Sequence, residues 1–190
     1  MGMDRAFEVF PALQTERLHL RKLELSDSIE LYSYFSLEEV TKYYDVETFR
    51  TEQEAEELIE SLFFSYEQGK QIRWGITKKE TNELIGTCGF HSIDRTHSKL
   101  EVGYDLHPDY WSLGIMSEAM HRIISYAFEE MDVNRIEAFY FPKNIASKRV
   151  LEKNGFQHEG ILRKRFLHKG SYLDAVLTAK LKEDRKEDLL

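Results

Sequence analysis

The segment from His107 to Met120, HPDYWSLGIMSEAM, contains one glycine, Gly114, and a helical pattern begins directly after it. Backbone N–H groups at a helix N-terminus have no partner inside the helix, and with the helix dipole they attract an anion. Residues 112–117 would direct several of these donors at one point, and Gly114 would let a ligand approach the backbone. The segment has no lysine to neutralise a phosphate. On this pattern alone, it is either a main-chain anion site or a plain connection.

The elements on either side would place this segment at the edge of a sheet. Residues 99–106, KLEVGYDL, alternate along a predicted strand, with one face made by Leu100, Val102, Tyr104 and Leu106. Residues 116–131 carry apolar side chains at helical spacing, and residues 135–141, RIEAFYF, form another strand. A strand, a long helix and a second strand favour parallel pairing of the two strands.

A short helix is predicted directly after the second of these strands, in NIASKRVLEKNGF. Asn144 is its expected N-cap, and Gly155 with Phe156 forms its expected C-terminal stop.

The remaining chain supplies further strands and helices. Residues 71–78 and 83–90 precede the strand at 99–106 with short connections, which predicts an antiparallel meander. Residues 51–69 read as a helix, because Thr51 and Glu54 have capping-box spacing. The last two strands turn at the sequence KGS. We therefore expect a mixed α/β sheet in one domain over residues 1–190, with an ordered core from about 13 to 183.

Composition and charge exclude several classes of protein. The 190 residues are 42% hydrophobic and 32% charged, which indicates one soluble globular domain. A formal net charge of −8 argues against a general nucleic-acid or anionic-membrane binder. No run approaches the roughly 20 apolar residues of a membrane span. We expect neither a nucleic-acid nor a membrane partner.

Cysteine and histidine usage indicates a reducing compartment and no metal. Cys88 is the only cysteine and lies in the apolar run LIGTCGF, so we expect a buried, inert thiol and a cytoplasmic protein. The seven histidines lack the spacing of a metal site.

Three segments in order carry a resemblance to a known family: EVGYDLHPDYWSLGIMSEAM, NIASKRVLEKNGF and GILRKRFLHKGSYLDAVL. Together they resemble the GCN5-related N-acetyltransferases (the GNAT superfamily), in particular the RimJ/RimL-like branch of ribosomal-protein alanine and serine N-acetyltransferases. The resemblance covers nearly the whole chain. It implies a single-domain GNAT fold with a mixed, mostly antiparallel sheet of about six or seven strands, a splayed parallel pair and about four flanking helices.

The resemblance implies acetyl-CoA as cosubstrate, its pyrophosphate held by N–H groups of the loop and its pantetheine arm between the splayed strands. In the superfamily loop, Gln/Arg-x-x-Gly-x-Gly/Ala, Trp111 takes the first position and Met116 the last, where a small residue is usual. Ser112 replaces a glycine that is common in this branch. The implied cofactor-binding residues are Leu106, Trp111, Ser112, Leu113, Gly114, Ile115, Met116, Ser117, Asn144, Ser147 and Lys148. Lys153 is an alternative phosphate partner.

The resemblance also implies catalytic roles. Glu101 matches a strand glutamate that often serves as general base in the family, although an ordered water chain is an alternative. The usual tyrosine acid is absent from its place in RVLEKNGF, and Ser147 is the RimL-like substitute. Asn144 would hold the pantetheine or the substrate while capping its helix. A backbone N–H near Leu106 would polarise the thioester.

The attacking amine must be neutral, which favours a protein α-amine with a pKa of about 7.7–8 over a lysine-type amine of about 10.4. The branch implies acetylation of a protein N-terminus, of the ribosomal-protein type, by direct attack on the thioester in a ternary complex. A small amine such as a polyamine, an aminoglycoside or an amino acid is the alternative acceptor. A non-catalytic acyl-CoA-binding regulator is a third hypothesis, and a homodimer is plausible.

Overall fold

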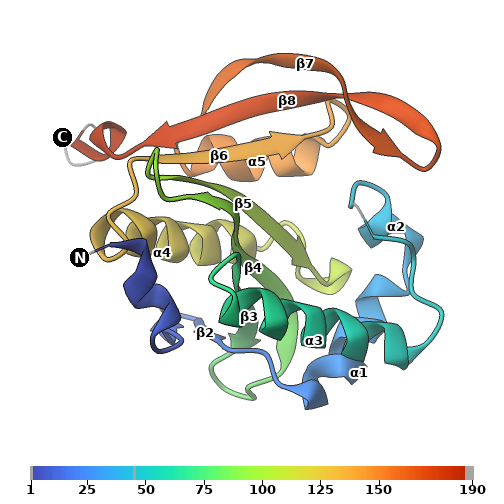
Figure 1. The fold of residues 1–190 in the computed structure, drawn as a ribbon. Helices are drawn as coiled ribbons and strands as arrows, with labels where there is room; N and C mark the ends of the chain where they lie inside the picture. Colours follow the sequence, from blue (N-terminus) through green and yellow to red (C-terminus); the bar gives the residue numbers. More distant parts are fainter. Residues whose placement is uncertain (1, 45, 187–190) are drawn as a thin grey trace.

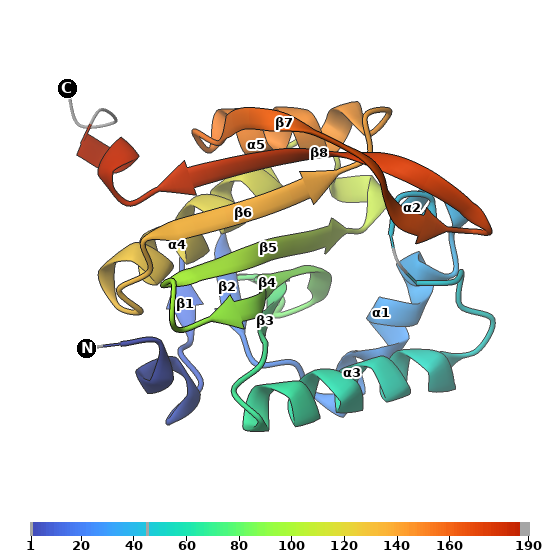
Figure 2. The same ribbon diagram turned by 45° about the horizontal axis from the view of Figure 1, so that its top comes forward.

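The computed structural model describes residues 2–44 and 46–186 and contains an eight-stranded sheet in the order β1-β2-β3-β4-β5-β6-β8-β7 (Figure 1). Neighbouring strands pair antiparallel except β5 and β6, which run in the same direction (Figure 2). The strands are β1 (Leu13–Gln14), β2 (Leu18–Arg21), β3 (Ile72–Lys78), β4 (Leu84–Asp94), β5 (Lys99–Leu106), β6 (Arg135–Tyr140), β7 (Gln157–His168) and β8 (Ser171–Leu181).

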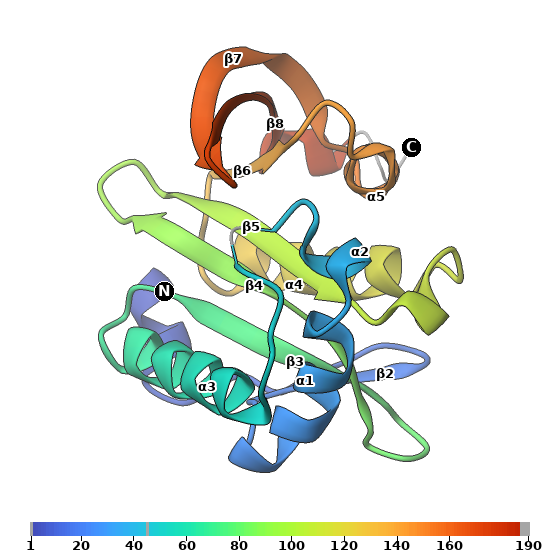
Figure 3. The same cartoon turned by 90° about the vertical axis from the view of Figure 1, so that its right-hand side faces the viewer.

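Helices cover both faces of this sheet. Figure 3 shows α4 and α5 together on one side and α1 with α3 on the opposite side. The helices are α1 (Ser28–Phe35), α2 (Glu38–Thr41), α3 (Glu52–Glu67), α4 (Ile115–Glu129) and α5 (Ile145–Lys153). Each face has its own buried apolar cluster, because strand side chains alternate between the two sides. No helix in the described ranges is long and apolar enough to cross a membrane.

Local sequence signals determine where the helices begin and end. The capping box predicted at α3 is present, with the Thr51 N–H donating to Glu54 Oε2 over 2.8 Å. At α5, Asn144 Oδ1 accepts from the Ser147 N–H over 3.1 Å, which confirms the predicted N-cap. Gly155 ends that helix with φ of +78°, and Phe156 N donates back to the Leu151 carbonyl.

The predicted parallel pair is confirmed, and it is short. Residues 99, 100 and 101 of β5 pair with residues 135, 136 and 137 of β6. Beyond Glu101 the two strands have no further paired residues, while β6 stays paired with β8 up to Tyr140. The sheet is therefore splayed between the C-terminal ends of β5 and β6.

The fold differs from the sequence-based expectation mainly at the N-terminus. β1 adds an eighth strand, and its two residues are too few for an alternating pattern to reveal. The expected core began at about residue 13, yet Met3 and Ala6 are buried. Tyr66 donates to the Ala6 carbonyl over 3.0 Å, so this segment packs against α3.

The backbone of β3 passes very close to Gly89 of β4. A Cβ at residue 89 would lie 2.2 Å from the Ile72 carbonyl oxygen and 2.7 Å from the Arg73 Cα. We expect Gly89→Ala to lower the free energy of unfolding by about 3 kcal/mol, measured by urea denaturation, because backbone atoms cannot yield as a side chain does. Gly160→Ala in β7 is the matched control, since nothing lies within 4 Å of its Cβ position. Equal effects of the two substitutions would contradict the role of this close approach.

Candidate active site

A cleft of about 1040 Å³ lies where β5 and β6 separate. Residues from β3, β4, β5 and β6 form its walls, together with the start of α4, helix α5, and parts of α1, α3 and β7. The strand alternation divides these walls into two halves. Val102, Tyr104 and Leu106 belong to the α4 face, whereas Glu101 and Asp105 belong to the face of α1 and α3.

The conformation of the loop between β5 and α4 is fixed by a side-chain hydrogen bond and by two residues with left-handed backbone angles. The Trp111 indole Nε1 donates to the Leu106 carbonyl over 2.8 Å, which ties the loop back to the strand end. Ser112 and Gly114 both take left-handed backbone angles, with φ of +62° and +76°. For Ser112 this conformation costs about 1–2 kcal/mol, a cost that a glycine would avoid. Helix α4 begins at Ile115, so the N–H groups of its first turn are unpaired within the helix and lie beside the cleft.

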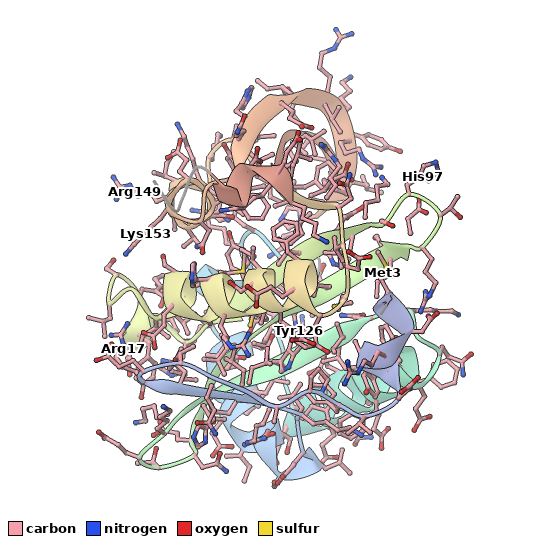
Figure 4. All side chains as sticks on the ribbon, turned by 90° about the vertical axis from the view of Figure 1, so that its left-hand side faces the viewer. Met3, Arg17, His97, Tyr126, Arg149 and Lys153 are labelled. Carbon is pink, nitrogen blue, oxygen red and sulfur yellow. The ribbon has the colours of Figure 1, made fainter. Side chains whose placement is uncertain are left out.

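Two cations from distant parts of the chain flank Gly114. A Cβ at residue 114 would lie 3.7 Å from Arg17 Nη2 and 4.0 Å from Lys153 Nζ. Figure 4 shows Arg17 and Lys153 on opposite sides of the start of α4. Lys153 supplies positive charge that the loop itself lacks, and Arg17 adds N–H donors, although Glu118 offsets its charge.

Glu118 on α4 holds Arg17 in this position. Arg17 Nε donates to Glu118 Oε2 over 2.6 Å, and Arg17 Nη1 donates to the Leu113 carbonyl over 3.1 Å. Thr15 donates to the other carboxylate oxygen over 2.5 Å. Burial acts to raise the pKa of Glu118, but the hydrogen bonds from Thr15 and Arg17 lower it overall, so the carboxylate stays charged. The β1–β2 connection is thereby fastened to the loop.

A hydroxyl pair lies on the α4 face of the cleft. Ser147 Oγ is 2.7 Å from the Tyr104 hydroxyl, and Asn144 positions Ser147 by capping α5. Burial raises the pKa of Tyr104, although its hydrogen bond with Ser147 acts the other way, so the phenol stays protonated.

A carboxylate and an imidazole lie together on the opposite face. Glu101 and His91 are cross-strand partners, and His91 Nε2 is 3.7 Å from Glu101 Oε2. His91 Nδ1 is 3.1 Å from the Glu101 carbonyl oxygen, which can only accept, so the ring hydrogen lies on Nδ1. Burial and the Arg73 charge lower the pKa of His91. Nε2 of the neutral ring therefore carries no hydrogen and lies beside the carboxylate as a second proton acceptor.

The comparisons with known proteins identify the family. The model of the acetyltransferase (GNAT) domain matches residues 17–157. An uncharacterized N-acetyltransferase of Bacillus subtilis (strain 168), YoaA, is 39% identical over 166 residues, which cover 87% of this chain and 94% of that protein. The chain belongs to the GNAT acetyltransferase family.

Solved GNAT structures agree with the fold. A GNAT-family acetyltransferase from Bacillus anthracis is 30% identical with a TM-score of 0.82, covering 91% of this chain and 99% of that one. The ribosomal-protein-S5-alanine acetyltransferase from Vibrio fischeri is 26% identical with a TM-score of 0.80, covering 92% and 98%.

The GNAT family uses acetyl-CoA, and the residues of this cleft suit it. Unpaired N–H groups and the side chains of Arg17 and Lys153 surround Gly114, which has no side chain of its own. Hydrogen-bond donors and positive charge of this kind bind a pyrophosphate. The paired edges of β5 and β6 end at Glu101 and Glu137, which leaves strand-edge donors and acceptors for the amides of a pantetheine arm. The bound donor would supply an acetyl thioester.

Most of the residues proposed from the sequence line this one cleft: Glu101, Leu106, Trp111, Ser112, Gly114, Ile115, Met116, Ser117, Asn144 and Ser147. Leu113 lines the adjoining hollow with Arg17 and Lys153. Lys148 is not brought to the cleft; its Nζ lies 3.6 Å from Glu152 Oε1 on the outer face of α5. Met116 is buried in the apolar cluster beneath the loop and also contributes to the lining of the cleft.

Four residues that the sequence analysis did not propose for the site belong to its geometry: Arg17, Arg73, His91 and Tyr104. The pairing of His91 with Glu101 could not be read from the turn, because the register of β4 and β5 shifts between His91 and Asp94. Counting back from the Asp94–Lys99 pair would place Ser92 opposite Glu101. Tyr104 was assigned to the apolar row of its strand, and its hydroxyl reaches Ser147 from there. No local signal indicates Arg17, which lies 97 positions before Gly114 in the sequence.

Lys153 should contribute to CoA affinity through its charge. We expect Lys153→Gln to weaken CoA binding by about 1 kcal/mol, roughly fivefold in Kd, measured by titration calorimetry at low salt. The loss should shrink at high salt, because the site is open to solvent. Lys148→Gln, on the same helix but paired with Glu152, is the matched control and should leave Kd unchanged. Equal losses in the two variants would show only a general effect of net charge.

Proposed function

We propose that this GNAT N-acetyltransferase acetylates the α-amine of a protein N-terminus by direct attack on the thioester in a ternary complex. The face of the cleft that carries Glu101, on the side of α1 and α3, is here called the acceptor face. The observation that carries the proposal is the pair of proton acceptors on this face, Glu101 Oε2 and His91 Nε2, 3.7 Å apart. The relative from Vibrio fischeri is described as acting on alanine of a ribosomal protein, which supports an acceptor of this class.

Glu101 is the general base in this proposal. A protein α-amine is partly neutral at pH 7 because its pKa is about 7.7–8, so the base must remove a proton only as the C–N bond forms. His91 Nε2 provides a second acceptor beside the carboxylate, and its lowered pKa keeps it free of a proton near neutrality. The Nδ1 contact with the Glu101 carbonyl fixes the ring orientation.

Ser147 is the proposed proton donor to the leaving thiolate. Its hydroxyl lies on the α4 face of the cleft, which extends from the β5–α4 loop to the acceptor face. The Tyr104 hydroxyl, at hydrogen-bond distance, orients the Ser147 hydroxyl and can donate a hydrogen bond to its oxygen as the proton leaves, while the raised pKa of Tyr104 keeps its own proton in place. Ser147 would regain its proton from solvent through the cleft.

Substitution tests these two roles. We expect Glu101→Gln to lower kcat/KM for the amine by about 100-fold, and Ser147→Ala to lower kcat by about tenfold, because each removes a proton-transfer group. Both variants should bind CoA within about twofold of the wild type, since neither residue is placed at the phosphates. Parallel losses of turnover and CoA affinity would refute the assigned roles.

The pH dependence with different amines tests the acceptor class. With a peptide carrying a free N-terminus, we expect kcat/KM to rise about tenfold per pH unit and to level off near pH 8, as the α-amine becomes neutral. A polyamine should be turned over far more slowly at pH 7, and its rate should continue to rise toward pH 10. CoA release is the measured signal. Faster turnover of the polyamine than of every peptide at pH 7 would overturn the proposal in favour of a small-amine acceptor.

A further inference from the structure

Arg73 of β3 lines the acceptor face of the cleft, together with Glu101 and His91. Its side chain is only 8% exposed and is held by two sets of bonds. Nε donates to Thr87 Oγ1 over 2.6 Å, and Nη2 donates to Asp105 Oδ2 over 2.5 Å and to the Tyr44 hydroxyl. The guanidinium is therefore fixed in one orientation.

Both carboxylate oxygens of Asp105 accept hydrogen bonds within this network. Its Oδ1 accepts from the Tyr34 hydroxyl and the Thr87 N–H, at 2.7 and 3.1 Å. Its Oδ2 accepts from Arg73, from the Thr87 hydroxyl at 2.6 Å and from the Tyr44 hydroxyl at 3.2 Å. The carboxylate, 3% exposed, cancels the arginine charge and offers nothing to a substrate.

Of the three Arg73 guanidinium nitrogens, only Nη1 has no hydrogen-bond partner among residues 2–44 and 46–186. Every fully buried side-chain nitrogen or oxygen in those ranges has a partner, so Nη1 is not fully buried, and Arg73 lines the cleft. It lies 3.5 Å from the point that a Cβ on Gly103 would occupy, and His91 Cε1 lies 3.7 Å from the same point. Because residue 103 has no side chain, the donor stays open beside the cleft.

The spacing of these groups matches the start of a peptide. Glu101 and Gly103 lie on the same face of β5, two residues and about 6.8 Å apart. In an N-terminal residue the amine nitrogen and the carbonyl oxygen are about 3 Å apart, and each hydrogen bond adds about 2.9 Å. One such residue, with a hydrogen bond at each end, spans up to about 8.8 Å, which is enough to bridge groups placed at residues 101 and 103 of one strand face.

We propose that Arg73 is a specificity residue, whose Nη1 donates a hydrogen bond to the first main-chain carbonyl oxygen of the acceptor. The inference rests on the proposed function and deepens it. Since Asp105 neutralises the guanidinium, the donor suits a neutral carbonyl oxygen. An alkylamine or polyamine has no oxygen at this distance from its nitrogen and would leave a desolvated donor unpaired. The substrate class is therefore an α-amino acyl amide, as at a peptide N-terminus.

Three forms of one peptide test the inference on the wild-type enzyme. The first bond is a normal amide, an ester that keeps the carbonyl oxygen, or an (E)-alkene that lacks it. The comparison uses kcat/KM values corrected to the neutral amine from pH profiles, because loss of the carbonyl raises the amine pKa. We expect similar corrected values for the amide and the ester, and a value at least about tenfold lower for the alkene. An alkene as good as the amide would overturn the inference. Failure of all three, with turnover of an alkylamine, would instead overturn the proposed function on which the inference rests.

Two variants locate the effect. Gly103→Ala covers Nη1 at ordinary contact distance and leaves the Arg73–Asp105 pair intact, so we expect a folded protein in which the amide-to-alkene ratio falls toward one. Arg73→Lys should have the same effect on that ratio. Melting temperature and CoA affinity serve as controls for folding. An unchanged ratio in folded Gly103→Ala would contradict the inference even if Arg73→Lys proved unstable.

Discussion

β5 and β6 share backbone hydrogen bonds only up to Glu101 and Glu137, and the rest of the site depends on this early separation. Each strand keeps its outer partner, β4 for β5 and β8 for β6, so the sheet stays continuous while its centre opens. The inner strand edges beyond these residues hold backbone groups that need partners from another molecule or from water. The cleft is therefore a consequence of sheet topology, and helices α4 and α5 line one side of it.

Charge is distributed along the cleft according to the chemistry of each part. The chain is acidic overall, yet Arg17 and Lys153 converge on Gly114, where phosphates would lie. At the other end, Arg73 and Asp105 neutralise each other in a buried network, which leaves a single directed donor. Every oxygen of the carboxylate is hydrogen-bonded, which offsets the cost of burying the pair. In the proposed function, one end of the cleft selects by charge, and the other selects by hydrogen-bond geometry.

Sequence reasoning succeeded where the signal is local. The capping box at Thr51, the N-cap at Asn144 and the stop at Gly155 each depend on residues a few positions apart, and each is present. Reasoning from neighbours along the chain could not find the hydroxyl pair, because Tyr104 and Ser147 are 43 positions apart. Helix α5 contains no tyrosine, and the phenol beside Ser147 comes from β5.

The sequence by itself determined the longer strands and helices, the parallel pair and the main-chain donors of the loop, since these follow from periodicity, capping and glycine placement. Only the tertiary structure decided which side chains meet in the cleft. Arg17 reaches Gly114 through its bond to Glu118, and Lys153 reaches it because α5 packs beside α4. Arg73 becomes a directed donor only because Asp105, Thr87 and Tyr44 hold it beside the bare face of Gly103. Such groups lie on different elements, and their distances are set by packing between elements, which no local pattern encodes.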